Sequence, residues 1–167
     1  PGSRAIGFAM NVAYILWRNA ASRAVRLNMN TWSASDIASP WIRLISRKDR
    51  GFRQAGTGVI EAFYDGYNLI GDTSWDFVVK LDGDVTLEKD YFEHCLMRFS
   101  KHPKLGIGGG TVCKRVGDVL EPESKVDPWF HVRGATKIYR KRCWEQIGGL
   151  LRQPGWDTLD EVKANML

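Results

Sequence analysis

The stretch FVVKLDGDVTL, from Phe77 to Leu87, decides the fold expected for this chain of 167 residues. The apolar run to which it belongs predicts a strand from Trp75 to Leu81, dense enough to lie in the centre of a sheet. Asp82, Gly83 and Asp84 follow that strand directly. Because ligands of open α/β sheets bind beyond the carboxyl ends of the strands, we expect both carboxylates to lie at a binding site.

The chemistry of the acidic pair points to a metal ion. Two carboxylates at one strand end repel each other unless they share a cation or a proton. Mg²⁺ and Mn²⁺ accept carboxylate and phosphate oxygens together, so a divalent ion that carries a diphosphate would relieve the repulsion. Asp82 and Asp84 are therefore predicted to hold Mg²⁺ or Mn²⁺. A surface turn is the competing interpretation, because Asp and Gly are favoured turn residues.

Strand patterns alternate with helix patterns along the chain, which predicts an α/β fold with a mostly parallel sheet. After the acidic pair, Thr86 is predicted to cap a helix that ends at Pro103. Beyond it we expect strands over residues 105–114 and 134–139, a glycine-capped helix over 141–147, and a last helix from 159 onward, capped by Asp157 or Thr158.

The part of the chain before the acidic pair is less regular. A short strand is predicted over residues 41–45, and a helix over 52–64 that Asp65 and Gly66 should end. Residues 5–17 form the most apolar stretch, and they fit either a helix or a buried strand.

Composition excludes several classes of protein. Hydrophobic residues make up 44% and charged residues 26%, as in an ordinary globular domain. The three cysteines are odd in number and contain no Cys-x-x-Cys pair, so neither a disulfide framework nor a zinc site is expected, and a reducing cytoplasmic location is predicted. No apolar run reaches about 18 residues, so no spanning helix is predicted.

The net charge of +5 suits an anionic partner. A nucleotide diphosphate, an acidic glycan or the inner face of a membrane, bound peripherally, would all fit this charge. Nucleic acid is not an expected partner, because the basic residues are dispersed and no RNA-binding or DNA-binding motif is present.

Four segments, taken in order, resemble the family 2 glycosyltransferases, which have the GT-A fold. The resemblance runs from about Trp41 to Leu167 and rests on ISRKDRGFRQAGTGVIEAF (Ile45 to Phe63), FVVKLDGDVTL, VRGATKIYRKRCWEQIGGL (Val132 to Leu150) and GWDTLDEVKANML (Gly155 to Leu167). It implies a three-layer sandwich and transfer of a sugar, with inversion, from a nucleotide-diphospho-sugar to a hydroxyl of a glycan, lipid or protein acceptor. Such enzymes serve polysaccharide or cell-envelope biosynthesis.

The resemblance also implies roles on the donor side. Asp82 would lie near the ribose and a metal-bound water, and Asp84 would ligate the divalent cation. Arg50 and Gly51 would lie beside the nucleotide.

On the other side of the reaction, Asp157 aligns with the catalytic base that deprotonates the acceptor hydroxyl. Asp160 and Glu161 are the alternatives, because a shift of three or four positions lies within the error of the alignment. Three aromatic residues are candidates to stack on sugar rings or to line the acceptor side, namely Trp129, His131 and Trp156.

The front of the chain departs from the family pattern. The two opening strands that hold the nucleobase and ribose are not recognisable in residues 1–40. We therefore divide the chain into an unassigned or divergent segment, 1–40, and a glycosyltransferase-like core, 41–167, which we expect to be truncated at its C-terminus.

Two alternatives to an active transferase remain open. A non-catalytic remnant or interaction domain would keep the fold without the reaction. The pattern D-x-D-x-T, formed by Asp82, Asp84 and Thr86, also resembles the first motif of haloacid-dehalogenase-type phosphatases, with Asp82 as nucleophile and Asp84 as acid/base. That motif normally lies near the start of its domain, and the downstream lysine and paired aspartates are not evident here.

Overall fold

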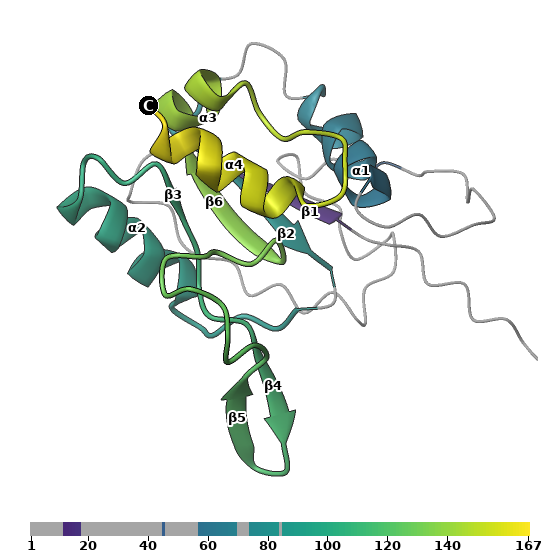
Figure 1. Ribbon diagram of the computed structural model, residues 1–167, viewed down its shortest axis with the longest axis vertical. Coiled ribbons are helices and arrows are strands. Elements are labelled where there is room, and N and C mark those ends of the chain that lie inside the picture. Colours follow the sequence, from purple (N-terminus) through teal and green to yellow (C-terminus); the bar gives the residue numbers. More distant parts are fainter. Residues whose placement is uncertain (1–11, 18–44, 46–56, 70–73, 84) are drawn as a thin grey trace, which may run out of the picture.

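The computed structural model describes residues 12–17, 45, 57–69, 74–83 and 85–167 (Figure 1). Its central sheet has the strand order β1-β2-β6-β3, with bounds Val12–Trp17, Phe77–Asp82, Thr136–Arg140 and Ile107–Gly108. A separate hairpin, which projects from the rest in Figure 1, consists of β4 (Cys113–Val116) and β5 (Val119–Pro122). The helices are α1 (Thr57–Tyr67), α2 (Tyr91–Lys101), α3 (Lys141–Ile147) and α4 (Trp156–Asn165).

The α/β class is confirmed. The prediction of a mostly parallel sheet is wrong for these four strands, because all three pairs of neighbouring strands are antiparallel. The reason lies in the connection between β2 and β6. Leu81 near the end of β2 pairs with Thr136 at the start of β6, so the long intervening segment brings the chain back to the end of the sheet where β2 stopped. A parallel neighbour would need a crossover to the opposite end.

Helices cover both faces of the sheet, because side chains alternate along each strand. On one face, Val78 and Tyr139 share a core with side chains from α1, α3 and α4, among them Ile60, Phe63, Trp144 and Trp156. On the other face, Val79, Leu81 and Ile138 pack against Phe92 and Phe99 of α2. Figure 1 shows α4 lying across the face formed by β6 and β2.

The elements with strong local signals agree with the sequence. β2 covers the predicted central strand and continues to Asp82. α3 has the predicted bounds and ends at Gly148, whose φ of 72° is the left-handed conformation that favours glycine. Within residues 5–17 the described part, Val12–Trp17, is a strand, so the helix alternative is wrong there.

Two boundaries differ because packing overrides local preference. The predicted cap at Thr86 is wrong, since α2 begins at Tyr91. Val85 and Leu87 pack against the core while Thr86 between them is exposed, and this alternation requires an extended chain rather than a helix. α1 also continues past the predicted break at Asp65 and Gly66, because the ring of Tyr67 packs on Trp144 with a centroid distance of 5.2 Å.

Two further predictions differ in detail. The strand expected over residues 105–114 is two separate strands, β3 in the central sheet and β4 in the hairpin. α4 begins at Trp156 rather than at Leu159, so Asp157 lies in its first turn instead of capping it, and the N-cap position is Gly155. The strand predicted over residues 41–45, apart from Ile45, and the start of the helix predicted from Phe52 lie outside the described residues. None of the helices in the described ranges has the length and apolar character needed to cross a membrane.

Candidate active site at the carboxyl end of β2

Asp82 is the last residue of β2, and its side chain is 30% exposed. Strand alternation puts it on the same face as Lys80, which is the face covered by α4. The Lys80 side chain is 1% exposed, and its ammonium group donates hydrogen bonds to Asp82 Oδ1 and, at 2.6 Å, to the carbonyl oxygen of Gly134. A buried cation therefore links the end of β2 to the chain just before β6.

Asp157 reaches the same place from the first turn of α4. A Cβ atom added to Gly134 would lie 3.2 Å from Asp157 Oδ2 and 2.8 Å from Cζ2 of Trp156. Only glycine fits at position 134 without a shift of the helix, because the Trp156 ring closes directly on the backbone there. The Asp82 N–H donates to the carbonyl oxygen of Ala135 at 2.8 Å, so Asp82 and Asp157, far apart in sequence, both lie next to residues 134–135.

Asp160, one of the alternatives to Asp157 as base, is held by buried donors. The Lys137 side chain is 0% exposed. Its ammonium group lies 2.8 and 3.0 Å from the two carboxylate oxygens of Asp160 and also donates to the backbone carbonyl of Asp157. Tyr139 Oη donates to Asp160 Oδ2 at 2.5 Å. Burial, and then the Asp160 charge, raise the pKa of Tyr139 well above its usual range, so this phenol stays a donor.

Glu161, the second alternative, holds three partners. Its Oε1 accepts hydrogen bonds from Lys137 Nζ at 3.0 Å and from the backbone N–H of Val132 at 2.8 Å. Its Oε2 lies 2.9 Å from His131 Nδ1. Glu161 therefore ties α4 to the segment before β6. In contrast, within the described part of the chain, the Asp157 carboxylate takes part in no hydrogen bond or ion pair.

The expectation that Trp156 offers its face to a sugar needs correction. Trp156 is 6% exposed and belongs to the core between the sheet and α4. Two ammonium groups lie near its ring, Lys80 Nζ at 5.2 Å and Lys137 Nζ at 5.8 Å from the centroid. This aromatic side chain helps to accommodate the two buried cations, and it leaves no open face for a ligand.

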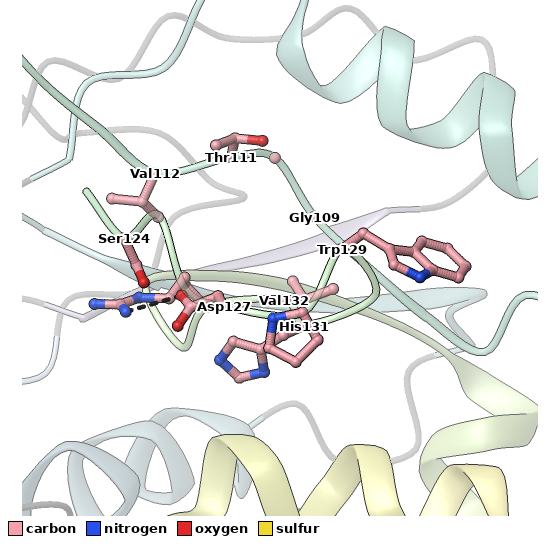
Figure 2. A pocket seen from close by; sticks show the side chains of 11 residues that line it. Gly109, Thr111, Val112, Ser124, Asp127, Trp129, His131 and Val132 are labelled. Carbon is pink, nitrogen blue, oxygen red and sulfur yellow. Dashed lines mark hydrogen bonds and ion pairs between the residues drawn. The ribbon is translucent and has the colours of Figure 1, made fainter. Parts of the chain in front are cut away.

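The other two aromatic candidates lie at a pocket next to these acids. The pocket has a volume of about 230 Å³, and its lining includes Trp129 and His131 together with Asp127 and Arg133. Figure 2 shows Asp127 and His131 on one side of it and the Trp129 ring on the other. Neither Asp82 nor Asp157 lines the pocket, but Arg133 on its wall precedes Gly134 in the chain.

A second pocket of about 230 Å³ lies between α1 and α3 and is lined by aromatic rings. The polar atoms of its three aromatic side chains already have hydrogen-bond partners. Tyr64 Oη accepts from the backbone N–H of Leu150 and donates to the carbonyl of that residue, and Trp144 Nε1 donates to Tyr67 Oη at 2.9 Å. The pocket beside the acids is therefore the better candidate for recognising a polar ligand.

The glycine cluster before the hairpin forms one wall of the first pocket, and its sequence is explained by close backbone contacts. A Cβ atom on Gly109 would lie 2.3 Å from the carbonyl oxygen of Thr136, and one on Gly110 would lie 2.5 Å from the Tyr91 ring. Tyr91 Oη accepts a hydrogen bond of 2.9 Å from the Gly110 N–H. Helix α2 thereby positions this wall.

This contact gives a pH-dependent prediction. Burial raises the pKa of Tyr91 from 10.0 to about 12. Since the neutral phenol is favoured in the folded protein, its contribution to stability is complete below pH 10 and is lost as the pH rises to about 12. At neutral pH, Tyr91→Phe should cost about 1–3 kcal/mol, because it leaves the Gly110 N–H without its acceptor. Chemical denaturation should show that the difference in the free energy of unfolding between wild type and variant becomes smaller from pH 10 to 12. A constant difference would contradict the raised pKa of Tyr91.

The structure adds two residues that sequence reasoning missed, Lys80 and Lys137. Each is a lysine inside an otherwise apolar strand pattern, VVKL and TKIY, and that pattern was the available signal. Asp84, Arg50 and Gly51 lie outside the described residues. Within the described ranges, no three His, Cys, Asp or Glu side chains are grouped so that they could hold a metal ion.

No protein-family model, no curated protein and no solved structure matches this chain.

Proposed function

We propose that the chain provides the metal-diphosphate and catalytic-base side of an inverting glycosyltransferase on a GT-A-like fold. The observation that carries the proposal is that Asp82 and Asp157 both lie next to residues 134–135, Asp82 through its N–H and its Lys80 partner, and Asp157 through the first turn of α4. The sequence motifs assign the segments of these two acids to the donor and the base. Helices on both faces of the sheet support it as well. The acceptor would supply a hydroxyl, and the donor would be a nucleotide-diphospho-sugar.

Asp157 is the strongest of the three candidates for the base. A base must have a carboxylate oxygen available for the proton of the acceptor hydroxyl. Asp160 and Glu161 would first have to give up bonds to Lys137, Tyr139 or the backbone. The Asp157 carboxylate, half-buried at the start of α4, has no such bond within the described residues, while Lys137 fixes its backbone carbonyl. Attack by the deprotonated oxygen in line with the leaving diphosphate inverts the anomeric carbon.

The acidic pair fits a divalent ion by the chemistry of its donors. Mg²⁺ or Mn²⁺ bound with a diphosphate needs only one or two protein carboxylates, because phosphate oxygens and water complete the coordination. Asp82 supplies one carboxylate at the strand end, and Asp84 is proposed from the sequence to supply the second. When bound, the ion would neutralise the charge that develops on the departing diphosphate. Arg50 and Gly51 remain proposed contacts of the nucleotide.

Binding of the donor product tests this site. A nucleoside diphosphate (UDP, GDP or dTDP) with Mn²⁺ should stabilise the protein by about 2.7 kcal/mol at a ligand concentration about 100 times its Kd, visible as a rise in Tm. Asp82→Asn and Asp84→Ala should remove most of that rise. Asparagine is chosen at position 82 because its oxygen still accepts from Lys80.

The matched control for these variants is Asp118→Asn in the exposed turn between β4 and β5, which should keep the full rise in Tm. If none of the three nucleotides raises the Tm of the wild-type protein, donor binding is absent and the non-catalytic alternative is favoured. If the rise survives in both acidic variants, the nucleotide binds elsewhere and the D-x-D assignment is wrong.

A further inference from the structure

Trp129 stands out among the aromatic residues because it is 94% exposed. Its ring meets that of Phe130 edge to face, with centroids 5.7 Å apart and an interplanar angle of 86°. The indole thus lies exposed where it lines the first pocket. An aromatic ring exposed at the edge of a pocket offers a flat apolar face on which a ligand can stack.

Charged planar groups surround the pocket beside that ring. Arg133 donates through Nη1 to Asp127 Oδ2 at 3.1 Å and through Nη2 to Glu123 Oε2 at 3.0 Å (Figure 2 marks the pair with Asp127). A hydrogen bond from the Ser124 hydroxyl, followed by Arg133, lowers the pKa of Asp127, so this carboxylate is ionised. All three charged side chains are partly exposed, and a guanidinium between two carboxylates offers both donors and acceptors to a ligand.

His131 adds a further polar group in a fixed position. Its Nδ1 lies 2.9 Å from Glu161 Oε2, so α4 holds this ring in place at the pocket wall. Glu161 also holds the N–H of Val132, and it stands four residues after Asp157 in α4. The same helix thus carries the proposed base and fixes the wall of the pocket.

From these contacts we propose that the pocket binds the acceptor and that the acceptor is a carbohydrate. One face of a sugar ring would stack on Trp129, while its hydroxyls bond to Asp127 and Arg133. The role as acceptor rests on the proposed transferase function, whereas saccharide binding itself does not. An aromatic platform beside paired polar groups matches a sugar, which has an apolar C–H face and a polar rim.

The charge of the region favours a sugar over a membrane surface. A segment that binds anionic lipid carries an excess of basic residues. From Cys113 to Arg133 the basic and acidic side chains are equal in number, being Lys114, Arg115, Lys125 and Arg133 against Asp118, Glu121, Glu123 and Asp127. The exposed apolar residues here therefore lack the electrostatic partner that an anionic bilayer requires.

Saccharide binding can be measured without nucleotide or metal. Cellohexaose, chitohexaose and maltohexaose are titrated into the wild-type protein, with isothermal calorimetry or saturation-transfer NMR as readout. At least one of them should bind, and Trp129→Ala should weaken it by about tenfold or more. Val126→Ala is the matched control, since Val126 is 90% exposed in the same loop but does not line the pocket, and it should leave the affinity unchanged.

Several outcomes would overturn the proposal. It fails if none of the three saccharides binds, or if Trp129→Ala binds as tightly as wild type. It also fails if phosphatidylserine vesicles bind the protein and both Trp129→Ala and Val126→Ala weaken that binding, because the loop is then a membrane surface. Saccharide binding without a nucleotide-dependent rise in Tm would refute the transferase function alone, and the reverse pattern would refute the carbohydrate pocket alone.

Discussion

Replacing Asp157 with asparagine is expected to lower the rate of sugar transfer by about 10²–10⁴-fold, which is the usual contribution of a positioned general base. Asparagine keeps the shape of the side chain but cannot take the proton of the acceptor hydroxyl. The measurement is the release of nucleoside diphosphate, in the presence of Mn²⁺, from sugar derivatives of the nucleotide that raises the Tm. Binding of that nucleotide should be unchanged, because the donor side rests on Asp82 and Asp84.

Loss of the acidic side chain also has a structural effect that must be separated from catalysis. Asp157 lies in the first turn of α4, where a negative charge contributes about 0.3–1 kcal/mol through the helix dipole. The variant should therefore remain folded, and its Tm should fall only slightly. Asp118→Asn provides the matched change at an exposed turn and should keep the wild-type rate. An Asp157→Asn protein with the wild-type rate would exclude Asp157 as the base.

Lys137→Met is expected to be the most destabilising single change in the described part of the site. The lysine is fully buried, and its removal leaves Asp160 and Glu161 buried next to each other without their cation. Breaking a buried pair by removal of one partner costs about 3–5 kcal/mol. Denaturation in urea should show this loss as a lower midpoint with a similar slope.

The control for Lys137→Met is Lys141→Met, the same substitution four residues later. Lys141 is about half exposed and lies 3.9 Å from Glu145, a pair that contributes at most about 1 kcal/mol. Adding Asp160→Asn to Lys137→Met should restore part of the lost stability, since it removes one of the two unpaired charges. Equal effects of Lys137→Met and Lys141→Met would mean that the buried pair contributes no more than a surface one.

The parts of the fold that the sequence predicted well are those set by local signals. α3 is bounded on one side by β6 and on the other by Gly148, and neighbouring residues specify both limits. The start of α2 and the end of α1 were missed because tertiary contacts decide them, through Val85 and Leu87 in one case and Tyr67 in the other. Sheet direction depends on where a long connection returns, and no local pattern encodes that.

The candidate site shows the same division. The D-x-D motif and the segment with Asp157 stand out in the sequence, and the structure places Asp82 and Asp157 next to residues 134–135. The sequence alone left three acids in α4 as candidates for the base. The preference among them depends on which carboxylates are bonded to the buried lysine, and the sequence does not show this. A lysine in a strand pattern is normally read as a solvent-facing position, so the role of Lys137 emerged only from the packing of α4 on the sheet.

The ion pair of Lys137 with Asp160 spans 23 residues, whereas the hydrogen bond from Lys80 to Gly134 spans 54. Joining distant segments costs more chain entropy than joining near ones, and contacts between distant segments also form more slowly. β6, α3 and α4 are consecutive, so the framework around the proposed base assembles within one continuous piece of polypeptide. The end of β2, which carries Asp82, comes from a distant part of the sequence. The position of Asp82 therefore depends more on the folding of the rest of the chain than the position of Asp157 does.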